Sequence, residues 1–102
     1  MTRELVIWIE AESDLAEAFD WYELQCHGYG TLFLAAVDAA FMAVQENHQQ
    51  FPVIYKTLRR ALVRRFPYQI FFAADDTRII VLAILHARRS PKQWVKRINA
   101  PE

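Results

Sequence analysis

The run Ile79–Leu85 restricts the fold more than any other feature, because every one of its residues is apolar. A strand with no polar position is typical of the interior of a sheet that is covered on both faces. We therefore expect Ile79–Leu85 to be an inner strand with a layer packed on each side. A helical hairpin can supply one layer, and either a terminal segment or a partner protein must supply the other.

The first half of the chain predicts one strand and two helices. Leu5–Ile9 is rich in β-branched and aromatic residues, as strands are. Ser13 can cap a helix that follows and that ends at Gly28. The apolar stripe of this helix, which would place the thiol in the core, consists of Leu15, Ala18, Phe19, Tyr22 and Cys26. A second helix covers about Thr31 to Asn47, and so short a turn between helices predicts an antiparallel hairpin.

The second half predicts three strands and a short helix. The strands Leu58–Val63, Tyr68–Ala74 and Ile79–Leu85 are consecutive and joined by short turns, so we expect a meander. Ser90 and Pro91 then open a basic helix. The order β-α-α-β-β-β-α, with strands grouped after helices, indicates an α+β fold with a mainly antiparallel sheet. We interpret residues 1–102 as a single domain.

Composition excludes several classes of protein. No run approaches the roughly twenty apolar residues of a membrane span, and the N-terminus lacks the pattern of a signal peptide. Cys26 is the one cysteine, so no internal disulfide can form, and we expect a cytoplasmic protein. Cys26 and His27 are adjacent, but the chain offers no ligand spacing for zinc and no glycine-rich phosphate loop. We therefore expect neither a metal nor a cofactor.

The net charge of zero conceals opposite charges on the two halves. Residues 1–50 carry one base and nine acids, whereas residues 51–102 carry eleven bases and three acids. The halves thus have net charges of −8 and +8. Such an asymmetry indicates that the basic half meets a polyanion or an acidic protein. The alternative is that the two halves pair with each other in the fold.

Several segments together resemble the RelE/ParE superfamily, the toxins of bacterial type II toxin–antitoxin modules, often labelled plasmid stabilisation proteins. The resemblance runs from about Leu5 to Arg97, and it is carried by the combination, order and spacing of the pieces. These are Asp20-Trp21-Tyr22-Glu23 with Gly28-Tyr29-Gly30, Asn47 with Phe51-Pro52, the stretch from Arg59 to Tyr68, and His86-Ala87-Arg88-Arg89-Ser90-Pro91 with Trp94.

The resemblance implies a helical hairpin on a small, mostly antiparallel sheet, as the periodicity does. It implies no single activity. RelE-like members are mRNA endonucleases that work in the ribosomal decoding site, and ParE-like members share the fold but poison DNA gyrase. A cognate antitoxin is the implied partner of both.

His86 and Arg88 are the candidates for catalysis if the chain cleaves RNA. Attack by a 2′-hydroxyl needs a base, an acid for the leaving oxygen, and cations for the phosphorane charge. His86 ends the apolar strand, and Arg88 and Arg89 follow at once. A histidine beside several arginines can act as a base near neutrality. The alternative is a histidine at a strand end that bonds to the backbone.

Trp94 favours the ParE-like branch. RelE-like nucleases carry an arginine in the final strand and a catalytic tyrosine six residues later. Counting six from Arg88 gives Trp94, and an indole cannot transfer a proton as a phenol can. It is better suited to packing or to stacking on a partner.

The arginines of the second half form a predicted target-binding site. We expect five of them to converge near His86, because the first and third strands of a meander run in the same direction. With Trp94, the candidates are Arg60, Arg64, Arg65, Arg88 and Arg89. Such a cluster can clamp phosphates through forked hydrogen bonds. The alternative is a solvated strand face, or pairing with Glu17, Asp20 and Glu23 of the first helix.

Our expectation is thus a type II toxin with ParE-like action on an essential target such as DNA gyrase. Two alternatives stay open: a RelE-like ribosome-dependent mRNA endonuclease, and a non-toxic module that only binds its antitoxin and contributes to autoregulation at DNA. An acidic antitoxin segment should fold over exposed apolar and basic surface. Trp21 and Leu24, on the polar side of the first helix, are candidates for that surface.

Overall fold

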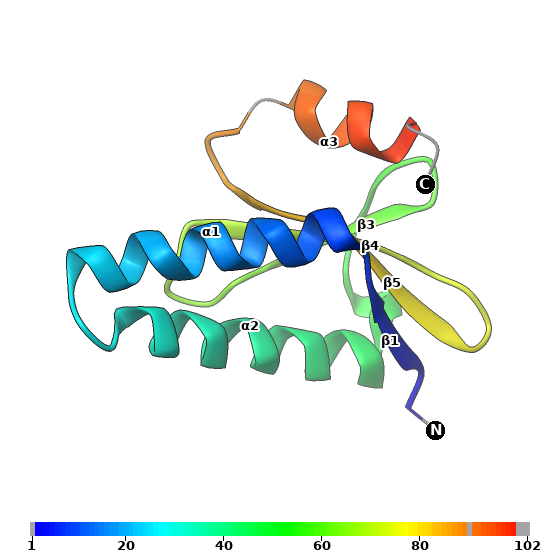
Figure 1. The fold of residues 1–102 in the computed structure, drawn as a ribbon. Coiled ribbons are helices and arrows are strands. Elements are labelled where there is room, and N and C mark those ends of the chain that lie inside the picture. The colour runs from blue at the N-terminus through cyan, green and yellow to red at the C-terminus, as the bar shows by residue number, and fades with distance from the viewer. Residues whose placement is uncertain (1, 90, 100–102) are drawn as a thin grey trace.

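The computed structural model describes residues 2–89 and 91–99, and its element order is that of an α+β protein (Figure 1). Ser90, the predicted start of the last helix, lies outside the described residues. The elements are β1 (Glu4–Ile7), α1 (Ile9–Gln25), α2 (Tyr29–Glu46), the short 3₁₀ helix η1 (His48–Gln50), β2 (Val53–Tyr55), β3 (Leu58–Leu62), β4 (Tyr68–Ala74), β5 (Arg78–His86) and α3 (Pro91–Asn99).

The five strands form one sheet in the order β1-β5-β4-β3-β2. The strands β3, β4 and β5 are consecutive antiparallel neighbours, which confirms the predicted meander. β1 pairs in parallel with β5, so β5 is an inner strand, as its unbroken apolar sequence predicts. The sequence pattern did not predict β2, a three-residue edge strand whose first residue, Val53, is exposed.

The helical hairpin covers one face of the sheet (Figure 1). Phe33 and Val37 of α2 pack with Ile70, Val81 and other inward-facing strand residues in a single buried cluster. Within the described residues, no helix is long and apolar enough to cross a membrane.

The other face is covered by α3, which Figure 1 shows in orange and red on the side away from α2. The Trp94 ring stacks on Phe71, with centroids 5.4 Å apart and an interplanar angle of 24°. It also meets Tyr55 edge-on at 5.8 Å. The second layer over the apolar strand was expected from either a terminal segment or a partner protein. The terminal helix α3 supplies it. A partner protein is therefore not what covers this face of the strand.

The first helix begins earlier than the sequence suggested, and Ser13 does not cap it. The helix starts at Ile9, with Trp8 at its N-cap and no side-chain cap. The Trp8 N–H donates to the Val81 carbonyl, and the Glu12 N–H donates to the Trp8 carbonyl. The chain thus passes from β1 into α1 through Trp8 alone, so no loop residue is placed to cap the helix with its side chain.

The turn between the helices is held by Glu23. One oxygen of its carboxylate accepts hydrogen bonds from the N–H groups of Gly28 and Gly30, at 2.9 and 2.8 Å. These bonds satisfy the start of α2, which begins at Tyr29 rather than Thr31. The placement of Cys26 in the core is wrong, because α1 ends at Gln25 and the extended backbone of Cys26 turns its side chain out to solvent.

Candidate functional site

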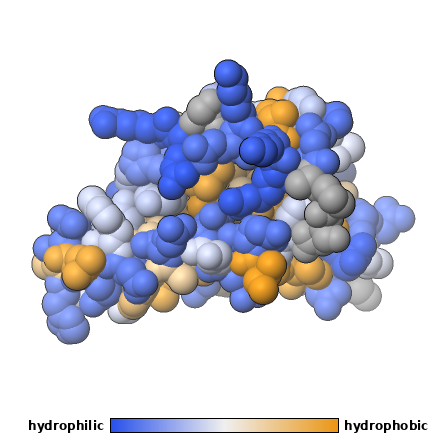
Figure 2. Space-filling model, turned by 45° about the horizontal axis from the view of Figure 1, so that its top comes forward, coloured by the Kyte–Doolittle hydropathy of each residue, from blue (hydrophilic) through white to orange (hydrophobic). Residues whose placement is uncertain are grey.

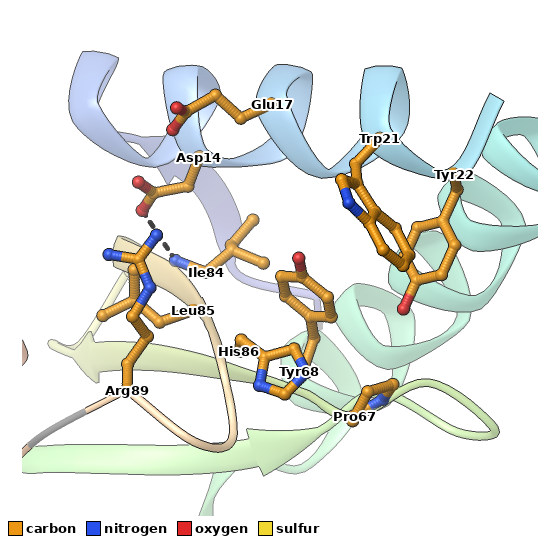
Figure 3. A pocket seen from close by; sticks show the side chains of 10 residues that line it. All are labelled: Asp14, Glu17, Trp21, Tyr22, Pro67, Tyr68, Ile84, Leu85, His86 and Arg89. Atoms are coloured by element: carbon orange, nitrogen blue, oxygen red, sulfur yellow. Dashed lines mark hydrogen bonds between the residues drawn. The ribbon is translucent and has the colours of Figure 1, made fainter. Parts of the chain in front are cut away.

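The main cavity near the predicted site lies between α1 and the ends of β4 and β5, and has a volume of about 510 Å³ (Figure 3). Figure 3 shows a mixed lining, with aromatic rings on one side and charged groups on the other. The lining residues are Asp14, Glu17, Trp21, Tyr22, Pro67, Tyr68, Ile84, Leu85, His86 and Arg89. We refer to it as the His86 cavity.

His86 is held by its own loop and by Tyr68. Its Nδ1 atom accepts a hydrogen bond of 3.0 Å from the Arg88 backbone N–H. Its ring meets the Tyr68 ring edge-on, with centroids 5.3 Å apart. Because Nδ1 accepts, the neutral ring carries its proton on Nε2. This geometry matches the alternative in which a histidine at a strand end bonds to backbone.

The His86 cavity has an acidic wall. Asp14 and Glu17 of α1 line it opposite His86 (Figure 3). Burial raises the pKa of the Tyr68 phenol, and while Arg89 lowers that pKa, Glu17 and Asp14 both raise it. Burial and the nearby Tyr68 also raise the pKa of Tyr22. The carboxylate of Glu17 opposes the approach of a phosphate anion to this side of the cavity.

Asp14 and Arg97 bind backbone groups of β5 at the part of its edge that β1 does not pair with. The sequence did not predict this contact. β1 pairs with β5 only as far as Val81. Beyond it, the Ile84 N–H donates to Asp14 Oδ2 at 3.0 Å, and Arg97 Nη1 donates to the Leu82 carbonyl at 3.2 Å. Arg97 and Asp14 also form an ion pair. Side chains from α1 and α3 thus form the hydrogen bonds to the β5 backbone that a further strand would otherwise form.

The five arginines predicted to converge do not share one surface. Residues paired directly across two strands have side chains on the same face. Arg60 pairs with Phe71, which lies under α3, whereas His86 pairs with Tyr68, which packs toward the helical hairpin. Arg60 and His86 are therefore on opposite faces. The meander brought the strand ends together as expected, but alternation along the strands separated the side chains.

Arg64 and Arg65 line a second cavity, between α2 and the β3–β4 turn. Its volume is about 480 Å³, and we call it the α2 groove. Its lining is otherwise apolar and consists of Tyr29, Leu32, Ala35, Ala36, Ala39 and Phe66. Leu32 is 59% exposed, so this side of α2 is unusually apolar for a solvent-facing helix. Arg65 adopts the left-handed backbone conformation, with φ at 73°, which closes the turn without a glycine.

Arg88, Arg89 and Trp94 lie at the junction of β5 and α3. Arg88 is exposed, and Arg89 Nη1 donates to Gln93 Oε1 at 2.8 Å. Only Arg89 of the five arginines lines the His86 cavity. Trp94 is half-buried between Phe71 and Tyr55, so its ring serves packing. Trp21 and Leu24 are exposed, as the sequence indicated.

Among the described residues, the opposite charges of the two halves meet in one of the ion pairs seen. Among the ion pairs seen within residues 2–89 and 91–99, Arg97–Asp14 is the one that joins the halves. Arg78–Asp75 and His27–Glu23 are both local. The basic half therefore presents most of its cations to solvent.

In the described part of the chain, no three His, Cys, Asp or Glu side chains gather as ligands for a metal ion.

Comparisons with known proteins agree on one family and fold. Residues 9–91 match the model of a family described as the ParE toxin of type II toxin–antitoxin systems, parDE. No curated protein sequence matches the chain. A solved chain from the chromosomal ParDE system of P. aeruginosa superposes with a TM-score of 0.73 at 18% identity, over 83% of this chain and 96% of that one.

A second solved chain, from the RelBE2 toxin–antitoxin complex of Mycobacterium tuberculosis, superposes with a TM-score of 0.60, also at 18% identity. The superposition covers 84% of this chain and 99% of that one. At these identities, the two structures establish the shared fold.

Proposed function

Because the chain belongs to the ParE toxin family of type II toxin–antitoxin systems, we propose that it inhibits DNA gyrase and is neutralised by a cognate antitoxin. The family match supports the toxin role and leaves the target open. The choice between gyrase and mRNA depends on whether the surroundings of His86 suit the cleavage of RNA.

The observation that carries the choice is the acidic wall of the His86 cavity. An RNA phosphate placed at His86 would face Glu17 and the Asp14–Arg97 ion pair, with Arg89 as the one arginine that lines the cavity. Cleavage needs cations around the phosphorane, and the carboxylate of Glu17 opposes its charge. Arg60 lies on the opposite face of the sheet, and Arg64 and Arg65 line the α2 groove. The His86 cavity therefore lacks the cluster of arginines that would bind the phosphate in a nuclease.

The packing of Trp94 supports the same conclusion. Its ring packs against Phe71 and Tyr55, and the indole N–H is far too weak an acid to act in general acid catalysis. The position that resembles the catalytic tyrosine of RelE-like nucleases thus contributes to stability. Inhibition by binding to a protein target needs no such group.

Arg88 and Arg89 are the residues that we assign to the target. They follow the last strand on an exposed loop, and arginine is enriched at the energetic centres of protein interfaces. We expect Arg88→Ala with Arg89→Ala to abolish growth arrest on expression. We expect His86→Ala to leave growth arrest intact, because the proposal gives that ring no catalytic step.

Three measurements decide between the outcomes. Thermal unfolding of each variant establishes that it is folded, growth curves report toxicity, and sequencing of RNA ends reports cleavage. If the wild-type chain cleaves mRNA and His86→Ala abolishes growth arrest, the RelE-like nuclease would be favoured. Growth arrest that persists without Arg88 and Arg89 would remove the loop from the target site, and no arrest with the wild-type chain would favour a non-toxic binding module.

The α2 groove is the surface that we assign to the antitoxin. It combines exposed apolar side chains with Arg64 and Arg65, which suits an acidic segment with an apolar stripe. We expect Leu32→Glu to prevent co-purification with the product of a short neighbouring reading frame. Val53→Glu is the matched control, since Val53 is exposed on β2 and outside the groove. If both variants lose co-purification equally, or if neither loses it, the antitoxin binds outside the α2 groove.

A further inference from the structure

We propose that two copies of this chain pair through the solvent-facing side of α2 and form a two-fold dimer when no antitoxin is bound. The contact surface, which we call the α2 stripe, consists of Leu32, Ala35, Ala39 and Met42. The inference concerns the free chain and does not depend on the action on gyrase. Because the stripe shares three of these residues with the α2 groove, a second copy and the antitoxin would exclude each other.

The α2 stripe is apolar on a side where a surface helix is ordinarily polar. Its four members recur at intervals of three and four residues, so they share one side of the helix. Phe33 and Val37 are buried on the other side, against the sheet. Leu32 and Met42 are 59% and 62% exposed, and the two alanines between them are also exposed. Contiguous apolar surface of this kind indicates an interaction site.

The shape of the α2 stripe suits a second helix. Small alanines at its centre, with Leu32 and Met42 at its ends, let another helix axis approach closely. The α3 side of the molecule differs, because Figure 2 shows it as mainly hydrophilic, with apolar residues in separate patches. An apolar stripe along a whole helix is therefore a local property of α2.

Charged groups of opposite sign flank the α2 stripe. On one flank, Arg64 and Arg65 line the α2 groove. On the other flank, Asp38 lies one helical turn after Leu34, which lines a smaller cavity together with Asp20 of α1. These two arginines and two aspartates are exposed, and none of them forms an ion pair within residues 2–89 and 91–99.

The two flanks select a second copy as the occupant of the α2 stripe. In a two-fold dimer both copies contribute the same surface, which must therefore complement itself. A two-fold axis parallel to α2 brings the acidic flank of each copy opposite the basic flank of the other. An axis across α2 would bring like charges together, and an acidic or basic peptide would match one flank alone. The charges thus favour a parallel pair of α2 helices.

The test measures the mass of the purified chain alone by light scattering, from about 1 to about 500 µM, since a single helix face is a small interface that gives weak association. We expect the mass to rise from 12.0 kDa toward twice that value. Asp20→Lys with Asp38→Lys should lower the affinity by roughly tenfold or more, and so should Arg64→Glu with Arg65→Glu. An equimolar mixture of these two variants should regain the wild-type affinity, because each flank again meets its opposite charge.

The matched control is Glu10→Lys with Glu17→Lys. It changes the net charge as the aspartate variant does, at two exposed positions of α1 that lie on the side of the His86 cavity, seven residues apart. We expect this control to pair with an affinity within about threefold of wild type. Thermal unfolding of each variant establishes that it is folded.

A cysteine at Ala39 provides a second measurement that needs no charge reversal. The exposed Cys26 is first replaced by Ser. Ala39→Cys in this chain should form a disulfide-linked dimer on mild oxidation, because the axis places Ala39 beside its own counterpart. Ala87→Cys, at an exposed position of the loop after β5, should stay largely monomeric.

Three results would overturn the proposal. One is a wild-type chain that remains at 12.0 kDa up to about 500 µM, which would leave the α2 stripe to the antitoxin alone. Another is a mixture of the two charge variants that pairs no better than either variant by itself. The third is equal cross-linking through Ala39→Cys and Ala87→Cys. Since only the free chain is used, each of these failures is separate from a failure of the antitoxin assignment.

Discussion

Asp14 and Arg97 lie 83 positions apart in the sequence and form the ion pair that joins α1 to α3 across the edge of β5. A second bond of the pair links Arg97 Nη2 to Asp14 Oδ1 at 3.3 Å. The same two side chains bind the Ile84 N–H and the Leu82 carbonyl. The pair thus completes the sheet edge and fixes the helix that covers the second apolar face.

Arg97→Ala should destabilise the fold by about 2 kcal/mol, because it leaves a largely buried carboxylate and the Leu82 carbonyl without this partner. The Asp14 side chain is only 10% exposed, so water replaces the guanidinium poorly. Urea unfolding followed by tryptophan fluorescence measures the change. Lys96→Ala, at an exposed position of the same helix, should change stability by under about 0.5 kcal/mol. Similar values for both would show that the pair contributes nothing.

Val81→Asp should prevent folding, because Val81 is fully buried in the inner strand and its replacement would bury an unpaired charge. Val81→Ala, which only removes methyl groups, should cost about 2 kcal/mol and leave a folded protein. Circular dichroism and thermal unfolding distinguish the two. A folded Val81→Asp variant with unchanged stability would contradict the position of β5 at the centre of the sheet.

Gly30→Ala should destabilise the turn between the helices by about 1 to 3 kcal/mol through steric overlap. A Cβ at Gly30 would lie 2.7 Å from the Phe19 ring and from Glu23 Cγ. Gly28→Ala has open space around it, but its φ of +94° strains any other residue. Phe19→Leu should therefore rescue part of the loss at Gly30 and none at Gly28. Rescue at both positions would refute the steric explanation.

Acid should weaken the β4–β5 turn through Asp75. The carboxylate accepts from the backbone N–H groups of Thr77 and Arg78, then from the Arg78 side chain, and these bonds lower its pKa from 3.8 to about 2. Since the folded pKa is the lower one, the stabilisation is complete above the unfolded pKa and disappears as the pH falls from about 4 to about 2. Thermal midpoints of wild type and Asp75→Ala should differ at pH 6 and converge by pH 2. A constant difference would exclude the carboxylate's charge as the cause.

The sheet, its inner strand and the helical hairpin could be predicted because each rests on a local pattern. The unbroken apolar run Ile79–Leu85 predicted a strand that is covered on both faces. The three residues of β2 were missed because an exposed edge strand this short carries almost no periodic signal.

The details of the site could not be predicted because they depend on contacts between distant parts of the chain. Nothing in the sequence around Asp14 indicates its partners, and only the fold places it beside Ile84 and Arg97. His86 looked like a base among arginines, yet the wall opposite it comes from α1. Adjacent basic residues in a sequence do not share a surface once strand alternation and turns have placed them.

The most direct test of the proposed action is a supercoiling assay with purified gyrase, relaxed plasmid, ATP and the purified wild-type chain. The account predicts loss of supercoiling and accumulation of cleaved plasmid after protein is digested. The Arg88→Ala, Arg89→Ala variant should show neither effect, and the His86→Ala variant should show both. Undisturbed supercoiling by gyrase, together with ribosome-dependent cleavage of mRNA that requires His86, would contradict the account.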